Sequence, residues 1–508
     1  MLASSAVLVL AAAGAAMAGP APSPWGASVT ASPTASPTAS PTAGPAAAPH
    51  AVPGGSWGTI RATLGDGGDA RARALVRQSD GELVAVGYAR DHGKYVIALS
   101  RFTVGGDLDM SFGHNGIVLT PLGSGKAAQA NAAVIQPDGR IVVAGSASDG
   151  GQQKFALARY NTDGKLDTGF GTGGLVMTAI GGDNTTSEGV ANALVLQPDG
   201  DLVAVGTATV TVMVGPSESE QAVVALARYT SVGVLDDGFG THGIAATALG
   251  AQGAAIASAN AAILQSDGGI VVGGNAFEES SNYAPGTYLT VLRYTSAGAL
   301  DGTFGSAAPS SGSGSAGAGG GTQTGAFIGH AGTSGGTSSI YGLTIDSNGN
   351  VVAAGYAQDH GHYKYVVLRL TGAGVADTTF GTGGYVLTDV GDGGSGSANA
   401  IASSADGELV AAGTALDGAR HKVGMLRLTS AGTVDNGFGN HGTTIIEFGA
   451  SAGATALLVQ PDGSLVTAGF DLSGARYDFL LTRTVPAAGG GKLDTGKLLT
   501  SLREPVGR

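Results

Sequence analysis

The sequence contains no cysteine in 508 residues, which excludes a disulfide framework and a lipid-modified cysteine anchor. Charged residues make up only 12% of the chain and aromatic residues only 6%. Acidic residues outnumber basic ones, and the formal net charge is −13. No basic stripe accompanies this charge, so we expect neither nucleic acid nor an anionic membrane as a partner.

The N-terminal part of the chain resembles export and spacer sequences. Residues 1–18 form an apolar run that ends in Ala16-Met17-Ala18, a pattern typical of a signal-peptide cleavage site. Residues 19–56 are rich in Pro, Ala, Thr and Ser and predict an extended stalk. We therefore expect a secreted or cell-surface protein without membrane insertion after cleavage. An uncleaved leader that serves as a membrane anchor is the alternative.

Glycine is abundant instead, with 90 residues, and much of it belongs to a repeat. Each copy has an apolar run, an Asp-Gly or Asn-Gly turn, two further runs, a loop of the form GxLDxxFGxxG and a short fourth run. We expect tight hairpins in which both turn residues tolerate positive φ. The turns are Asp80-Gly81, Asp138-Gly139, Asp199-Gly200, Asp267-Gly268, Asn348-Gly349, Asp406-Gly407 and Asp462-Gly463.

Seven copies of a four-stranded unit predict an all-β, seven-bladed β-propeller over residues 57–508, with a Gly/Ser-rich insertion at 306–324. An open β-solenoid is the alternative, although its coils usually repeat at shorter spacing. Residues 59–64 resemble a fourth strand that lacks the three strands before it, so strands from both termini would close the ring. Lys497 to Leu502 could instead supply the closing strand.

The repeat resembles the delta-60 repeat family of propellers and, more distantly, the NHL-type propellers. The Asp-Gly turn followed by LDxxFGxxG carries this resemblance, which covers about Trp57 to Leu499. It implies the propeller fold and no particular activity.

An arginine near the end of the third run recurs in every copy, and in six copies an aspartate follows eight positions later. We expect an Arg–Asp brace inside each blade, because a guanidinium and a carboxylate form two parallel hydrogen bonds. In the last copy Asp494 comes later. The arginines are Arg101, Arg159, Arg228, Arg293, Arg369, Arg427 and Arg483; the aspartates are Asp109, Asp167, Asp236, Asp301, Asp377 and Asp435.

We expect the Phe of each FG pair to pack as an apolar side chain between neighbouring blades. Four copies place an Asn seven residues before the turn Asp, where the other copies have Arg73, Tyr341 and Thr455. These side chains could line the mouth of the channel or cap their own strands through backbone hydrogen bonds. The four are Asn131, Asn192, Asn260 and Asn399.

The loops between the second and third runs vary most, and rigid scaffolds concentrate binding residues in such loops. Our candidate ligand-binding residues are His92, Tyr95, Tyr283, His360, His362, Tyr363 and His421. His360, His362 and His421 fall on adjacent blades, so a metal site there is conceivable. We nevertheless expect no metal, no cofactor and no catalytic residue. The GTSGG match at 332–336 lacks the strand–turn–helix setting of a nucleophile elbow.

These observations favour a monomeric, secreted or surface-exposed scaffold that binds a protein or a glycan without catalysis. The alternatives are an extracellular lyase or hydrolase with a site near the axis, and a purely structural surface protein. Glycine- and alanine-rich composition is typical of a bacterial source with GC-rich DNA.

Overall fold

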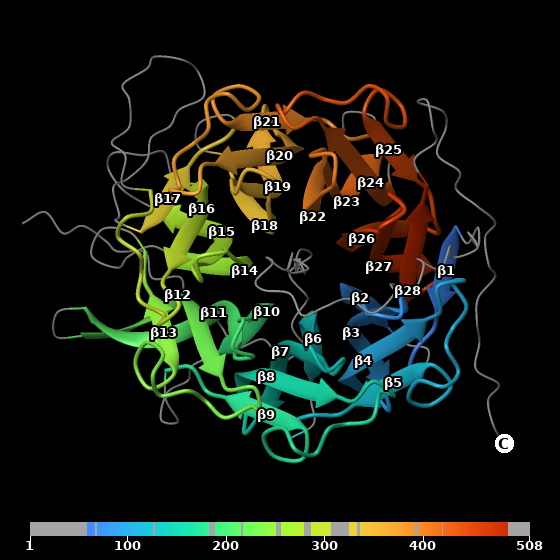
Figure 1. The fold of residues 1–508 in the computed structure, drawn as a ribbon, viewed down its shortest axis with the longest axis vertical. Coiled ribbons are helices and arrows are strands. Elements are labelled where there is room, and N and C mark those ends of the chain that lie inside the picture. The colour runs from blue at the N-terminus through green and yellow to red at the C-terminus, as the bar shows by residue number, and fades with distance from the viewer. Residues whose placement is uncertain are drawn as a thin grey trace, which may run out of the picture.

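The computed structural model describes residues 58–66, 69–124, 127–181, 188–214, 217–249, 256–278, 286–305, 325–332, 336–391, 395–418 and 420–485. They form 28 strands in seven four-stranded antiparallel sheets around a central axis (Figure 1). The predicted seven-bladed propeller is therefore confirmed. The expected leader (1–18), stalk (19–56) and insertion (306–324) lie outside the described residues.

Each blade contributes its first strand to the centre of the ring and its fourth to the rim (Figure 1). Blades 1 and 2 comprise β2 (Ala70–Arg77), β3 (Leu83–Asp91), β4 (Lys94–Phe102), β5 (Ile117–Thr120), β6 (Ala128–Ile135), β7 (Ile141–Asp149), β8 (Gln152–Tyr160) and β9 (Leu175–Thr178). Blades 3 and 4 comprise β10 (Gly189–Leu196), β11 (Leu202–Val214), β12 (Ser217–Tyr229), β13 (Ile244–Thr247), β14 (Ile256–Leu264), β15 (Ile270–Glu278), β16 (Gly286–Tyr294) and β17 (Ala326–Gly329).

The remaining three blades continue this order around the ring, and the last one takes its fourth strand from the start of the described chain. Blades 5 and 6 comprise β18 (Ser338–Ile345), β19 (Val351–Asp359), β20 (His362–Leu370), β21 (Tyr385–Thr388), β22 (Gly396–Ser403), β23 (Leu409–Asp417), β24 (Arg420–Leu428) and β25 (Thr443–Ile446). Blade 7 comprises β26 (Ser451–Val459), β27 (Leu465–Ser473), β28 (Arg476–Thr484) and β1 (Thr59–Ala62).

The ring is closed by β1, which pairs with β28 at the outer edge of blade 7, from Thr59↔Thr482 to Ala62↔Phe479. The predicted closure by strands from both termini is thus confirmed, although the strand ends two residues earlier than expected. The alternative segment, 497–502, lies outside the described residues. Since β1 already occupies the edge of β28, that segment is not needed to complete the blade.

The Asp-Gly turns differ from the prediction in one respect: only the glycine has positive φ, for example 85° at Gly139. Gly139 donates its backbone N–H to Gln136 O at 2.9 Å, and Gln136 donates to Arg140 O at 2.9 Å. This pattern is a three-residue loop, a type I turn followed by a left-handed glycine. The aspartate has another role, because Asp138 Oδ1 accepts the Arg140 N–H at 3.0 Å.

Every first strand carries one extra residue opposite the second strand, a β-bulge, at the position of the recurring Asn. In blade 2 the register shifts between Ala130 and Ala132, which leaves Asn131 as the bulged residue. The second strand has a glycine at this level. A Cβ at Gly145 would lie 1.9 Å from Gln129 O, so only glycine allows the bulge to approach this closely.

The bulged side chains join neighbouring blades around the axis. Asn131 donates its amide N–H to Ala191 O of blade 3 at 2.9 Å. Thr455 of blade 7 donates to Ala72 O of blade 1 at 2.8 Å, across the closure of the ring. The interpretation as caps of their own strands is therefore wrong, since these groups bind the carbonyl of the next blade, whereas lining of the channel mouth stays a prediction. The same contact links Asn192 to Ala259, Asn260 to Ile340 and Asn399 to Ala454.

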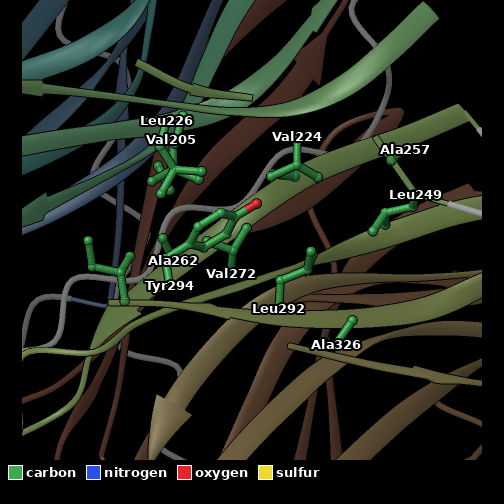
Figure 2. Packing of buried hydrophobic residues seen from close by; sticks show 14 of the residues in the cluster. Val205, Val224, Leu226, Leu249, Ala257, Ala262, Val272, Leu292, Tyr294 and Ala326 are labelled. Atoms are coloured by element: carbon green, nitrogen blue, oxygen red, sulfur yellow. The ribbon is translucent and has the colours of Figure 1, made fainter. Parts of the chain in front are cut away.

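The hydrophobic core is divided among the seams between blades. Figure 2 shows the seam between blades 3 and 4, where Val205 and Leu226 pack with Val272 and Tyr294. The buried Tyr294 hydroxyl donates to Thr247 Oγ1 of blade 3 at 2.8 Å. Full burial of one such aliphatic side chain stabilises the fold by about 1.5 to 3 kcal/mol. Each blade therefore depends on its neighbours for stability.

Candidate functional site

The propeller has two faces with different loops. The repeated-loop face carries the Asp-Gly turns and the loops between third and fourth strands. The variable face carries the hairpins between second and third strands and the linkers between blades. The linker that precedes blade 2 packs beside the end of β7, the second strand of that blade. Its Ser124 donates a backbone N–H to Ser148 O at 3.1 Å.

On the repeated-loop face, the recurring arginine donates to the aspartate eight positions later. The distance from Nε to the carboxylate is 2.6 to 2.8 Å in five blades, and Arg293 bonds Asp301 through Nη1. The guanidinium carbon also lies 4.6 to 5.0 Å from the centre of the Phe ring in those five blades. The arginine therefore packs between a carboxylate and an aromatic ring.

The arginine also crosses the seam between blades, which the spacing in the sequence did not indicate. Arg101 donates through Nη1 to Thr162 O of blade 2 at 2.7 Å, and Arg228 donates to Ser296 O of blade 4 at the same distance. Phe112 packs in the same seam against Gly164, where a Cβ would lie 3.0 Å from the ring. The brace expected inside each blade is thus also a link between blades.

Hydrogen bonds from the loop lower the pKa of two of these aspartates, Asp301 and Asp377. For Asp377 the Thr379 hydroxyl is the largest cause, burial opposes it, and Arg369 adds to the lowering. For Asp301 the Thr303 hydroxyl has the same role. These carboxylates are therefore charged partners held by their own loops, as a structural role requires.

Blade 7 departs from the pattern because β1 replaces the usual fourth strand. Arg483 donates through Nε to Ser464 Oγ at 3.1 Å and through Nη2 to Asp462, the aspartate of its own turn. Asp494 lies outside the described residues.

On the variable face, two of the candidate histidines occupy turn positions. His92 and His360 have φ of 47° and 50°, and each is followed by a glycine with positive φ. This is the conformation of a two-residue type I′ hairpin turn. Each ring also lies beside the preceding aspartate: Nδ1 is 2.9 Å from Asp91 and 3.0 Å from Asp359. Their placement is therefore explained by the turn.

The structure does not bring the candidate histidines together as metal ligands. His362 and His421 are exposed at the start of β20 and β24. Among the residues that the structure describes, no three or more His, Asp or Glu side chains are placed to hold one metal ion. Tyr283 lies outside that part of the chain.

The candidate tyrosines instead belong to aromatic columns. In blade 5 Tyr341, Tyr356 and Tyr363 follow one another with ring centres 5.8 and 5.2 Å apart. Tyr341 on the first strand is buried, whereas Tyr363 on the third strand is 38% exposed. In blade 1 Tyr95 packs edge-on against Tyr88 at 5.4 Å. Sequence analysis placed Tyr95 and Tyr363, the outer members, among the candidate ligand-binding residues but did not include the inner tyrosines, which lie within strands.

Several charges on the variable face neutralise one another. Lys154 Nζ lies 3.1 Å from Asp149, and Lys364 Nζ lies 3.1 Å from Asp359 and 3.5 Å from Asp389. Lys422 contacts both Asp417 and Glu447. The aromatic column of blade 5 thus stands beside paired charges, a setting that suits stacking and hydrogen bonding more than recognition of a charged ligand.

Two hollows lie on the described surface near blade 2. One, of about 850 Å³, runs along β9 from Pro121 to Gly233 on the outer wall and contains none of the candidate residues. The other, of about 30 Å³, is lined by Tyr88, Tyr95 and Gln153 and has room for about one water molecule.

Comparison with known proteins identifies the repeat. Five segments match the model described as "Domain of unknown function (DUF5122) beta-propeller", and each ends at the Phe of an FG pair. The segments are residues 78–112, 136–170, 197–239, 265–304 and 404–438. A search of curated proteins found no match.

Solved structures with a similar arrangement are distant. The polysaccharide lyase Uly1 is 12% identical over 81% of this chain and 89% of its own, with a TM-score of 0.45. The GH93 alpha-L-arabinofuranosidase of Fusarium graminearum is 8% identical over 74% and 98%, with a TM-score of 0.41. Sqt1 of Chaetomium thermophilum is 12% identical over 84% and 96%, with a TM-score of 0.37. At such low similarity, none of the three bears on the activity of this chain.

The part of the chain that the structure describes contains no helix long and apolar enough to cross a bilayer.

Proposed function

We propose that this protein is a non-catalytic binding scaffold that recognises a glycan on its variable face. The aromatic column of blade 5 carries the proposal. Tyrosine offers a flat apolar ring for the C–H face of a sugar and a hydroxyl for hydrogen bonding, at low cost in side-chain entropy. The exposed Tyr363 ring, supported edge-on by Tyr356 at 5.2 Å, provides such a surface beside paired charges.

The repeated-loop face is less suited to a ligand. Its recurring arginines and aspartates already bind one another and the neighbouring blade. A ligand there would have to replace these contacts, and the cost of leaving one buried partner unpaired is about 3 to 5 kcal/mol. The variable face needs no such exchange, because Tyr363 is exposed in the folded protein.

A glycan array tests the proposal. The purified chain should bind a defined set of oligosaccharides, and Tyr363→Ala should weaken that binding at least about ten-fold, as loss of a stacking anchor does. Val234→Ala is the matched control, because Val234 is an exposed residue on the repeated-loop face. Absence of binding to any glycan, or equal binding by both variants, would contradict the proposal. If the chain instead binds a secreted protein, and Tyr363→Ala abolishes that binding, the ligand is a protein and the binding site is still the variable face.

We also propose that the repeats are of the delta-60, NHL-like type and that the protein is secreted or displayed on the surface of a bacterial cell. The leader at 1–18 and the stalk at 19–56 support export. Intact mass of the protein from the culture medium tests this part: loss of residues 1–18 is expected. Retention of the leader in a membrane fraction would favour the anchored alternative.

A further inference from the structure

Blade 7 has a buried charge at a position where the other six blades have an alanine. This position is the seventh residue of the second strand, and in blade 7 it is Asp471, whose side chain is fully buried. A carboxylate that replaces a buried methyl group needs a partner, because an unpaired buried charge is costly. The six alanines, all buried, are Ala89, Ala147, Ala208, Ala276, Ala357 and Ala415.

The partner comes from β1, the strand that closes the ring. The third residue of the fourth strand is apolar in six blades, whereas in blade 7 it is Arg61. Arg61 Nε lies 2.9 Å from Asp471 Oδ2. Figure 1 shows β1, in blue, beside β28, in red, at the right of the ring. Both replacements therefore occur in the blade that joins the two ends of the described chain. The six apolar residues are Leu119, Met177, Ala246, Ile328, Leu387 and Ile445.

A second carboxylate shares this guanidinium. Asp478 on β28 is directly opposite Asp471 on β27. Arg61 pairs with Leu480, two residues beyond Asp478 on β28. Because side chains two residues apart on a strand lie on the same face, all three charges are on one face of the blade. The linker before β26 approaches Asp471 with Gly449, which brings no charge. One arginine thus faces two aspartates, and the group has one excess negative charge when both are ionised.

Burial opposes this excess charge. It raises the pKa of both carboxyl groups, and the charge of Asp478 raises the pKa of Asp471 further. Arg61 opposes the rise at both, and the Thr63 hydroxyl and Arg476 oppose it at Asp478. In the described part of the chain, neither oxygen of Asp471 accepts a well-aligned hydrogen bond. A proton on one of the two aspartates would leave a single balanced ion pair with Arg61.

We propose that Arg61, Asp471 and Asp478 form a closure cluster, which fixes β1 at the edge of blade 7 and holds the ring more firmly in mild acid than at neutral pH. The ion pair specifies the register, because a slip of β1 by one residue would move Arg61 to the opposite face. A slip by two residues would carry it about 7 Å along the strand, away from Asp471. Blade 7 needs such a contact because the chain does not continue from β28 into its fourth strand, as it does from β4 into β5.

The direction of the pH effect follows from linkage. A carboxyl group whose pKa is raised in the folded protein contributes its full stability below the unfolded pKa of about 3.9. That contribution is lost as the pH rises through the folded pKa. The closure should therefore loosen as the pH rises from mild acid, whereas the lowered pKa of Asp377 on the repeated-loop face has the opposite effect.

Hydrogen exchange of the full chain, followed by mass spectrometry, tests the closure cluster. Amide protection of β1, corrected for the intrinsic change of exchange rate with pH, should fall at least about three-fold from pH 5 to pH 7. Asp478→Asn removes the second carboxylate and leaves the pair of Arg61 with Asp471. This variant should abolish the fall and raise the protection of β1 at pH 7.

Arg61→Leu introduces the side chain that blade 1 has at Leu119 and leaves Asp471 buried without its cation. It should lower the protection of β1 at pH 7 at least about ten-fold. Adding Asp471→Ala gives both positions the side chains of blade 1, so protection should return to within about three-fold of that of the unmodified chain. Asp478→Asn, which keeps the shape of the side chain, decides the question even if Arg61→Leu does not fold.

Asp389→Asn is the matched control. Lys364 of blade 5 also contacts two aspartates, Asp359 and Asp389, but none of the three is on blade 7. This variant should leave the protection of β1 and its pH dependence unchanged. Equal pH dependence in Asp478→Asn and in the unmodified chain would overturn the proposal. So would a protection of β1 that rises from pH 5 to pH 7, or one that Arg61→Leu leaves intact.

Discussion

The two faces of the propeller differ in how closely their side-chain contacts repeat from blade to blade. On the repeated-loop face the same Arg–Asp–Phe contacts recur in five blades, with nearly constant distances. On the variable face the blades differ: blade 1 carries a tyrosine pair, blades 2 and 6 carry Lys–Asp pairs, and blade 5 carries both. The residues that recur hold the ring together, so a specific function is better sought among those that do not.

The largest effect should follow removal of one brace. Arg159→Ala leaves Asp167 and Ser231 O without their buried partner, and we expect a loss of about 3 to 5 kcal/mol in the free energy of unfolding. Arg140→Ala is the control, because Arg140 contacts the same Asp167 at 3.2 Å but is 41% exposed. Its cost should stay below about 1 kcal/mol in urea unfolding. Equal costs would mean that burial is not what gives the brace its importance.

The next largest effect concerns the inner ring. Asn399→Ala removes the hydrogen bond to Ala454 O and leaves that carbonyl unpaired in the seam between blades 6 and 7. We expect a loss of about 1 to 3 kcal/mol, measured as a shift in the urea midpoint. Asn399→Asp should cost at least as much, because a carboxylate cannot donate to the carbonyl. If Asn399→Ala leaves the urea midpoint unchanged, the hydrogen bonds made by the bulged side chains do not stabilise the packing of one blade against the next.

Acid should weaken the repeated-loop face in particular. The pKa of Asp377 is lowered by the Thr379 hydroxyl and by Arg369, so its contribution is fully present above the unfolded value of about 3.9. That contribution is lost as the pH falls through the lower folded pKa. Since Asp377 is partly exposed, the loss should be on the order of 1 kcal/mol or less.

Thr379→Val should make the free energy of unfolding less sensitive to acid. Without the hydroxyl, the pKa of Asp377 in the folded protein lies nearer its value in the unfolded chain. Urea unfolding at pH 7, 4 and 3 measures the difference between the variant and the unmodified chain. An identical pH dependence for the two would contradict the assignment to Asp377.

The smallest effect on stability should occur on the variable face. His360→Asn keeps a residue that tolerates positive φ at the first position of the hairpin turn, so we expect a change within about 0.5 kcal/mol. His360→Val should destabilise by about 1 kcal/mol or more, because a β-branched residue is strained there. Thermal unfolding of the two variants compares them directly. Loss of glycan binding in His360→Asn would give the imidazole a role beyond the turn.

Much of the architecture could be predicted because its signals are local. A turn at Asp138-Gly139, the strand Leu175–Thr178 and the Arg159–Asp167 spacing all lie within one repeat, so the chain itself carries the pattern. The turn type was predicted wrongly, since the aspartate acts by accepting the Arg140 N–H instead of adopting positive φ. The grouping of candidate residues was not predictable, because equivalent loops are separated around the ring.

The sequence by itself determined the number of blades, the closure by an N-terminal strand and the pairing of six of the seven recurring arginines with the aspartate eight positions later. Only the tertiary structure decided what the recurring Asn does. Its partner is a backbone carbonyl 55 to 80 residues away, and no spacing in the sequence marks that atom. The same holds for Tyr356, whose ring separates the buried Tyr341 from the exposed Tyr363. Contacts within a repeat follow from local geometry, whereas contacts across blades exist only once neighbouring blades have packed together.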